Sequence, residues 1–150
     1  MRWSFLLLLS IGLGQCNKDD LHPTVDALIF GSYYGRCASD CTKLYKLENQ
    51  QLYAKEKVLY ISDDWAFSTT PASQTDYDLA KNLLTKFPKQ LFEEPDQIGI
   101  PNAHDQGGLV IAVPDGESWR VWYIDTVTDR LPAYLVPYIQ DVRKVLDQLP

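Results

Sequence analysis

Residues 102–108 hold the polar cluster with the most suggestive chemistry, because His104 stands directly before Asp105. A histidine with an orienting acid could act as a general base, and the two side chains could also form half of a metal site. Adjacent side chains in an extended segment point to opposite sides, so adjacency alone does not make a dyad. No G-x-S-x-G nucleophile motif accompanies the pair. We favour a solvated loop whose glycines let the chain enter a strand.

Two groups of carboxylates could bind calcium, which takes several oxygen ligands. Asp63 and Asp64 form one group, and Glu93, Glu94 and Asp96 form the other. Neither has the spaced D-x-D-x-D-G pattern of a calcium loop. Charged, solvated loops are therefore the favoured interpretation, and we assign no catalytic residue, no metal ligand and no cofactor.

Aromatic side chains offer a different kind of candidate. An exposed Tyr33 or Trp122 would mark a binding surface for a partner or for a sugar ring. Our candidate binding surface comprises Tyr33, Trp65, His104, Asp105 and Trp122. Packing in the core is the expected fate of most other aromatic side chains.

The charge of the chain excludes one class of partner. Twenty acidic residues outnumber fourteen basic ones, which gives a net charge of −6. Proteins that bind nucleic acid neutralise phosphates with Lys and Arg, so we expect no nucleic-acid partner. We see no basic cluster for anionic lipid, and solubility is the favoured interpretation of the charge.

The first fifteen residues have the layout of a secretion signal. Arg2 supplies the positive start, residues 5–9 are an unbroken apolar run, and Ile11 and Leu13 extend it. Such signals have an apolar segment of roughly 7–15 residues, whereas a stable membrane-spanning helix needs about 20. We expect a signal peptide over residues 1–15, a tether over 16–26 and a single domain over 27–150.

Leu13-x-x-Cys16 resembles the lipobox of bacterial lipoproteins, in which the cysteine carries lipid and becomes the first mature residue. Gln15 departs from the usual small residue, as in lipoproteins of the Bacteroidota type. The acid-rich residues 17–20 are similar to their export tags for the outer cell face. The resemblance implies palmitate-like acyl chains on Cys16 that hold the domain on the membrane. Signal cleavage that leaves Cys16 as a free thiol is the alternative.

The resemblance also implies a location. A lipoprotein of this type is anchored in the cell envelope, at the outer membrane, and both a periplasmic and an outward-facing orientation stay open. The lipid on Cys16 would make the membrane itself the first partner.

A second resemblance covers most of residues 27–149. Residues 30–37 read Phe-Gly-x-Tyr-Tyr-Gly-x-Cys, residues 105–108 read Asp-Gln-Gly-Gly, and residues 122–125 read Trp-x-Ile-Asp. Together with a closing helix, this pattern resembles a group of small, uncharacterised bacterial lipoprotein domains. The resemblance supports the fold and implies no activity.

The remaining cysteines support secretion. Once Cys16 carries lipid, Cys37 and Cys41 are left, and an even number in an oxidising compartment suggests a disulfide. It would fix a short turn. A metal pair is the alternative, although zinc usually wants four ligands and only His22 and His104 are available as histidines.

Hydrophobic periodicity predicts an α+β domain: an antiparallel sheet of about five or six strands with two helices, the C-terminal helix packed on the sheet. We expect strands over residues 27–34, 42–47, 58–61, 109–113 and 118–124, and another from residue 52. Residues 114–117 form the turn of a hairpin. Helices are expected from the cap Thr75 to residue 87 and from Val136 to about Gln148.

The leading hypothesis for function is a non-enzymatic binding or assembly module on the cell envelope. Its partner would be an envelope protein or a glycan. One alternative is an envelope hydrolase or metal-binding enzyme that uses His104 and nearby acids. Another is an inhibitor of secreted proteases.

Overall fold

The computed structural model of the protein describes residues 25–35, 41–56 and 65–150. Its regular elements are, in chain order, β1 (Leu28–Tyr33), β2 (Thr42–Glu48), β3 (Gln51–Ala54), α1 (Gln74–Ala80), α2 (Asn82–Thr85), η1 (Lys89–Glu93), β4 (Gln97–Ile98), η2 (Ala103–Asp105), β5 (Gly108–Asp115), β6 (Ser118–Ile124), η3 (Thr128–Arg130) and α3 (Val136–Leu146). The η elements are short 3-10 helices. The signal peptide, most of the tether and the strand predicted at residues 58–61 lie outside the described residues.

The strands form one sheet in the order β3-β2-β1-β5-β6-β4. Neighbouring strands run antiparallel, except that the two-residue β4 runs parallel to β6. The predicted α+β class, with a six-stranded sheet and the C-terminal helix packed on it, is confirmed, although the parallel β4 makes the sheet mixed and not wholly antiparallel. The sequence did not indicate β4, which is held by main-chain bonds from Tyr123 N–H to Asp96 O and from Asp125 N–H to Ile98 O.

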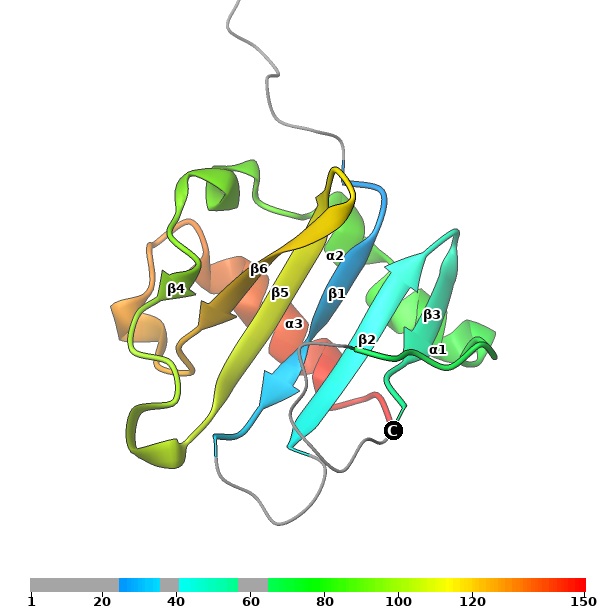
Figure 1. Cartoon of the computed structure of the whole chain (residues 1–150), viewed down its shortest axis with the longest axis horizontal. Coiled ribbons are helices and arrows are strands. Elements are labelled where there is room, and N and C mark those ends of the chain that lie inside the picture. The colour runs from blue at the N-terminus through cyan, green and yellow to red at the C-terminus, as the bar shows by residue number, and fades with distance from the viewer. Residues whose placement is uncertain (1–24, 36–40, 57–64) are drawn as a thin grey trace, which may run out of the picture.

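The helices cover one face of the sheet, with α3 crossing behind the strands (Figure 1). Side chains alternate along each strand, so every second residue faces this helical layer. Leu28 and Phe30 of β1, Ile111 of β5 and Ile139 of α3 are all 0% exposed in the resulting core. The opposite face of the sheet is therefore the one on which a binding site can be built.

The first helical segment begins earlier than predicted. Its cap is Ser73 and not Thr75: the Ser73 hydroxyl oxygen accepts a hydrogen bond from the Asp76 N–H at 3.2 Å and donates one to the Asp76 carboxylate at 2.7 Å. Ser73 stands three residues before Asp76, the spacing that lets a cap reach a free N–H of the first turn. The segment breaks between α1 and α2 at Lys81, and Pro88 follows it.

The closing helix α3 begins at Val136, as predicted, with Pro137 in its first turn, where no helical N–H is needed. It ends at Leu146, two residues before the predicted end. There the Lys43 ammonium donates to the carbonyl oxygens of Leu146 at 3.1 Å and Leu149 at 2.8 Å. These bonds satisfy carbonyls that have no helical partner and tie the helix end to β2.

A tight two-residue turn closes each of the two hairpins. The predicted hairpin of β5 and β6 is confirmed, and Gly116 has a φ of +62° at the first position of its two-residue loop. The β2–β3 loop uses Asn49 and Gln50, with φ values of +51° and +58°. Positive φ is easy for glycine, tolerable for asparagine and unfavourable for glutamine.

Within residues 25–35, 41–56 and 65–150, no helix is both long and apolar enough to cross a bilayer.

Candidate functional site

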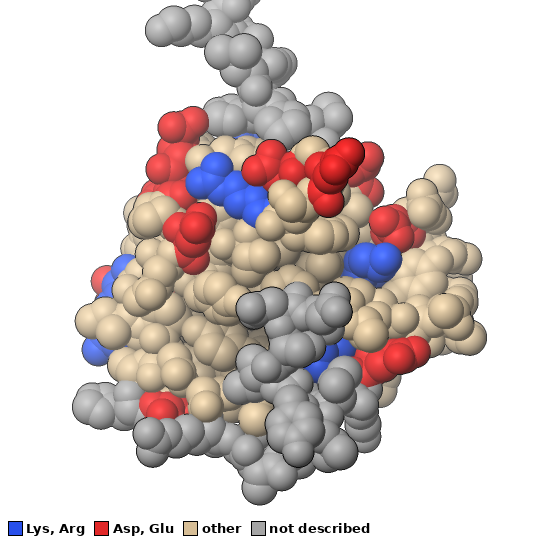
Figure 2. Space-filling view, viewed as in Figure 1, with Lys and Arg blue, Asp and Glu red and all other residues tan. Residues whose placement is uncertain are grey.

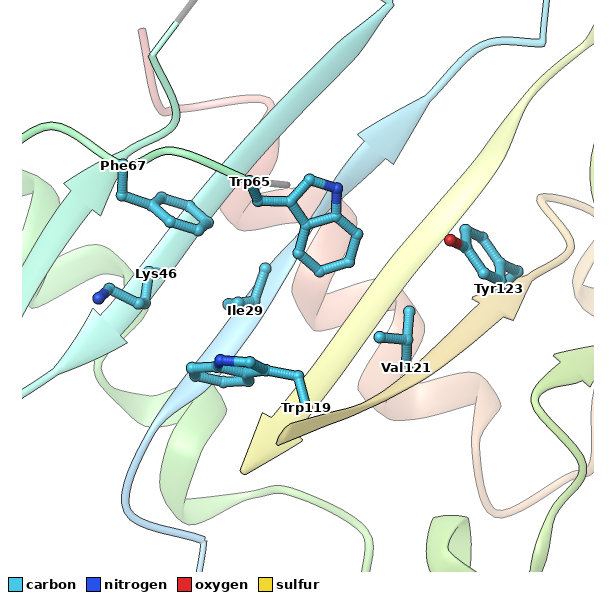
Figure 3. Close-up of a pocket in the computed structure, with 7 residues that line it drawn as sticks. All are labelled: Ile29, Lys46, Trp65, Phe67, Trp119, Val121 and Tyr123. Carbon is cyan, nitrogen blue, oxygen red and sulfur yellow. The ribbon is translucent and has the colours of Figure 1, made fainter. Parts of the chain in front are cut away.

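A pocket of about 600 Å³ lies on the face of the sheet opposite the helices. Figure 3 shows the described residues that line it, which we call the aromatic pocket: Ile29, Lys46, Trp65, Phe67, Trp119, Val121 and Tyr123. Four of these seven side chains are aromatic. They come from β6 and from the segment that follows residue 64, so distant parts of the chain meet here.

Strand β6 supplies one wall because its side chains alternate. Trp119, Val121 and Tyr123 face the pocket, and the residues between them face the helices. Val121 is paired with Ala112 of β5, which is paired in turn with Ile29 of β1. Ala112 carries only a methyl group. The row across these three strands is therefore lowest in the middle, which leaves a hollow between larger side chains.

The opposite wall comes from Trp65 and Phe67. An isolated antiparallel bridge pairs Phe67 with Lys55, just past the end of β3. Main-chain bonds of 2.9 Å run from Glu56 N–H to the Ala66 carbonyl and from Ser68 N–H to the Ala54 carbonyl. The backbone that carries the two aromatic rings is thus fastened to the edge of the sheet, and the rings return over its face (Figure 3).

Lys46 brings a charge to the pocket, and that charge is compensated. Its ammonium lies 2.9 Å from the Glu48 carboxylate and sits 5.5 Å above the centre of the Tyr53 ring and 5.6 Å above that of Phe67. Figure 3 shows the ammonium turned away from the pocket, so that the carbon chain of Lys46 borders it. Long basic side chains commonly bury their stems in this way.

Tyr33 extends the aromatic surface beyond the pocket. Its ring meets that of Tyr123 edge to face, with centroids 5.4 Å apart and an interplanar angle of 80°. Burial raises the pKa of the Tyr33 hydroxyl, and the Tyr123 hydroxyl and the Asp125 carboxylate raise it further. Tyr33 therefore stays a neutral hydrogen-bonding group and not a base.

Asp125 is a buried carboxylate whose hydrogen bonds hold parts of the fold together. It is 0% exposed, and its oxygens accept bonds from the N–H groups of Ile100 at 2.9 Å and Val127 at 2.8 Å and from the Arg130 guanidinium at 3.1 Å. Burial alone would raise its pKa, but these donors together hold the pKa of Asp125 below its ordinary value. A carboxylate that accepts so many bonds joins β6 to two loops and is poorly suited to accept a proton.

Trp122, named in the predicted binding surface, is buried in the core, so its assignment to that surface is wrong. Its side chain is 0% exposed and packs against Phe87 and Phe92, at centroid distances of 6.1 Å and 5.8 Å. The reason is the alternation of β6: Trp122 has the opposite orientation to Val121 and Tyr123, which face the pocket.

The other predicted surface residues are divided between two places. Trp65 lines the pocket and Tyr33 adjoins it through Tyr123. Asp105 is exposed in η2, has a φ of +61° and is not among the lining residues. The side chain of His104 lies outside the described part of the chain, so the His104–Asp105 hypothesis stays a prediction.

Within residues 25–35, 41–56 and 65–150, no three His, Cys, Asp or Glu side chains gather where they could hold a metal ion. Glu94 accepts a hydrogen bond from the Tyr134 hydroxyl at 3.0 Å. Asp63 and Asp64 lie outside the described residues. Cys41 is disulfide-bonded. Because Cys16 and Cys37 also lie outside these ranges, lipidation and the Cys37–Cys41 pairing stay predictions.

In comparisons with known proteins, no protein-family model matches the sequence, and no curated protein matches it significantly.

Sequence reasoning missed Trp119, Phe67 and Tyr123 as members of the site. The alternation that places Trp119, Val121 and Tyr123 on one face was visible in the sequence. Choosing between that face and the one with Trp122 required knowing which face the helices cover.

Proposed function

We propose that the protein is a non-enzymatic binding or assembly module of the cell envelope, held on the membrane by lipid on Cys16, and that the aromatic pocket is its binding site. The observation that carries the proposal is the pocket itself: Trp65, Phe67, Trp119 and Tyr123 converge on one hollow. Concave sites lined by aromatic side chains with a few polar groups are the usual form of a ligand site.

The chemistry of the pocket favours binding over catalysis. Its described lining offers aromatic faces, aliphatic groups, a tyrosine hydroxyl and one lysine whose charge is paired with Glu48. A general base with an orienting partner is missing from that lining, and Asp125 already accepts three hydrogen bonds. Indole rings give large contact area at low cost in side-chain entropy, which suits recognition.

The proposal is tested by isolating the full-length protein from gently solubilised envelopes and identifying co-purifying proteins and glycans by mass spectrometry. Three forms are compared: wild type, Trp119→Ala and the control Tyr34→Ala. Tyr34 is 54% exposed and does not line the pocket. We expect a component that wild type and Tyr34→Ala retain and Trp119→Ala loses.

Equal recovery of every component with all three forms would rule out the pocket as the binding site. A hydrolytic activity of the purified protein that disappears in His104→Ala would contradict the non-enzymatic assignment. Membrane retention of Cys16→Ala after removal of its signal peptide would contradict the lipid anchor, because this variant has no thiol at residue 16 to carry acyl chains.

A further inference from the structure

We infer that the occupant of the aromatic pocket is a neutral saccharide, with a sugar ring stacked on Trp119; this inference rests on the proposed function of the pocket. Size is the first argument. A volume of about 600 Å³ falls within the range of roughly 300–1,000 Å³ of small-ligand sites. A stable protein partner instead needs about 800 Å² of surface on each side. The pocket therefore suits a short chain of small rings.

The second argument is the shape of the aromatic surfaces. Figure 3 shows the Trp119 indole edge-on. One face of this indole is turned toward the pocket space, and Trp65 borders that space on the opposite side. A pyranose ring has an apolar face of C–H groups and carries its hydroxyls around its edge. Such a ring covers an indole face while its hydroxyls stay available for hydrogen bonds. The lining residues Trp65 and Trp119 also carry indole N–H groups, which can donate hydrogen bonds to such hydroxyls.

The charge of the described lining residues disfavours acidic ligands. Among the described lining residues only Lys46 is charged, and its ammonium is paired with Glu48 and turned out of the pocket. Figure 2 shows uncharged atoms over much of the described part of this face, with several acidic side chains and a basic one along its upper edge. Asp115, the last residue of β5, and Glu117, in the β5–β6 loop, are both exposed. An anion that entered the pocket would lose its hydration, and no unpaired cation among the described lining residues would compensate for that loss. A neutral sugar ring carries no charge, so its entry does not have this cost.

The test titrates full-length protein, in a detergent without a sugar headgroup, with neutral hexasaccharides: cellohexaose, maltohexaose, xylohexaose and mannohexaose. Hexagalacturonate is the acidic comparison. Tryptophan fluorescence reports binding. At least one neutral hexasaccharide should bind, and Trp119→Ala should weaken it at least about ten-fold, or about 1.4 kcal/mol. Tyr34→Ala should change it less than about two-fold. Trp119→Leu, which keeps apolar bulk but removes the flat ring, should resemble Trp119→Ala and serves if that variant does not fold.

Three results would overturn the inference. The first is binding of hexagalacturonate as tight as that of the best neutral sugar. The second is no binding of any neutral hexasaccharide while Trp119→Ala still loses its envelope component; the proposed function would then stand and only the ligand class would fail. The third is the persistence, at saturating sugar, of nuclear Overhauser contacts between Trp119 and residues 57–64, which lie outside the described ranges. If Trp119→Ala keeps its envelope component, the proposed function itself fails.

Discussion

Replacing Asp125 with asparagine tests how the end of β6 is fastened beside the aromatic pocket. The carboxylate is completely buried and accepts hydrogen bonds from the main-chain N–H groups of Ile100 and Val127. It also receives the Arg130 guanidinium, whose side chain is 44% exposed. An asparagine has nearly the same shape but keeps only one acceptor oxygen and turns an NH₂ group toward a donor.

The expected loss follows from these contacts. Leaving one buried N–H without an acceptor costs about 1–3 kcal/mol, and losing a charge-assisted bond costs about 1 kcal/mol more. The Arg130 contribution is small because that side chain is partly in water. We expect Asp125→Asn to lower the free energy of unfolding by about 3 kcal/mol in urea titrations at neutral pH. Asp129→Asn, at an exposed position, should change it by less than about 0.5 kcal/mol.

The pH dependence gives a second readout. The pKa of Asp125 is lowered in the folded protein, so its charge stabilises the fold above the unfolded-state pKa of about 3.9. That stabilisation is lost as the pH falls through 3.9 toward the lower folded-state value. The difference in stability between wild type and Asp125→Asn should therefore be largest above about pH 5 and shrink below about pH 4.

Either of two results would show that the Asp125 carboxylate does not stabilise the end of β6. One is a loss of stability no larger than that of the Asp129→Asn control. The other is a difference between wild type and Asp125→Asn that stays constant, or grows, as the pH is lowered.

Three further substitutions test other parts of the fold by urea denaturation. Gln50→Gly should stabilise the protein by about 0.5–1 kcal/mol, because glycine adopts the φ of +58° without strain. Asn49→Gly should stabilise it less, and equal stabilisation by the two substitutions would show that Gln50 is not strained. Tyr138→Phe should leave stability unchanged or raise it by up to about 1 kcal/mol, because the buried Tyr138 hydroxyl has no hydrogen-bond partner in the described chain; a clear loss would reveal one. Gly31→Ala should cost at least about 2 kcal/mol, since its methyl group would stand 2.1 Å from the Lys43 carbonyl oxygen, and a neutral result would show that β1 and β2 can separate.

Much of the fold was readable from the sequence where local signals agree. The β5–β6 hairpin has alternating or continuous apolar residues on both sides of a Pro-Asp-Gly turn, and α3 has an apolar stripe with proline in its first turn. In both cases periodicity and turn or cap chemistry indicate the same element. The parallel strand β4 was not readable, because its two residues carry no period and are held by bonds to β6, which lies far along the chain.

The candidate site was only half readable, for a different physical reason. Alternation in β6 separates Trp119 from Trp122, but both faces carry aromatic side chains, and hydrophobicity cannot tell which face the helices will cover. Trp65 was named as one of the aromatic side chains that could form a binding surface, yet its position over the sheet depends on main-chain bonds between residues 54–56 and 66–68. Sequence patterns thus identified the aromatic residues without showing which of them converge.

Oxidation of the tryptophans in intact envelopes is the most direct test of the claim that the aromatic pocket is occupied in the cell. The extent of oxidation of Trp65, Trp119 and Trp122 is measured by mass spectrometry, in envelopes and in the purified full-length protein. Trp122 is 0% exposed and should stay unreactive in both. If the aromatic pocket is occupied in the cell, Trp65 and Trp119 will react in the purified protein and be protected in envelopes, while oxidation of the exposed Tyr34, measured alongside, will be equal in both. Equal oxidation of Trp119 in the two preparations would contradict occupancy of the pocket.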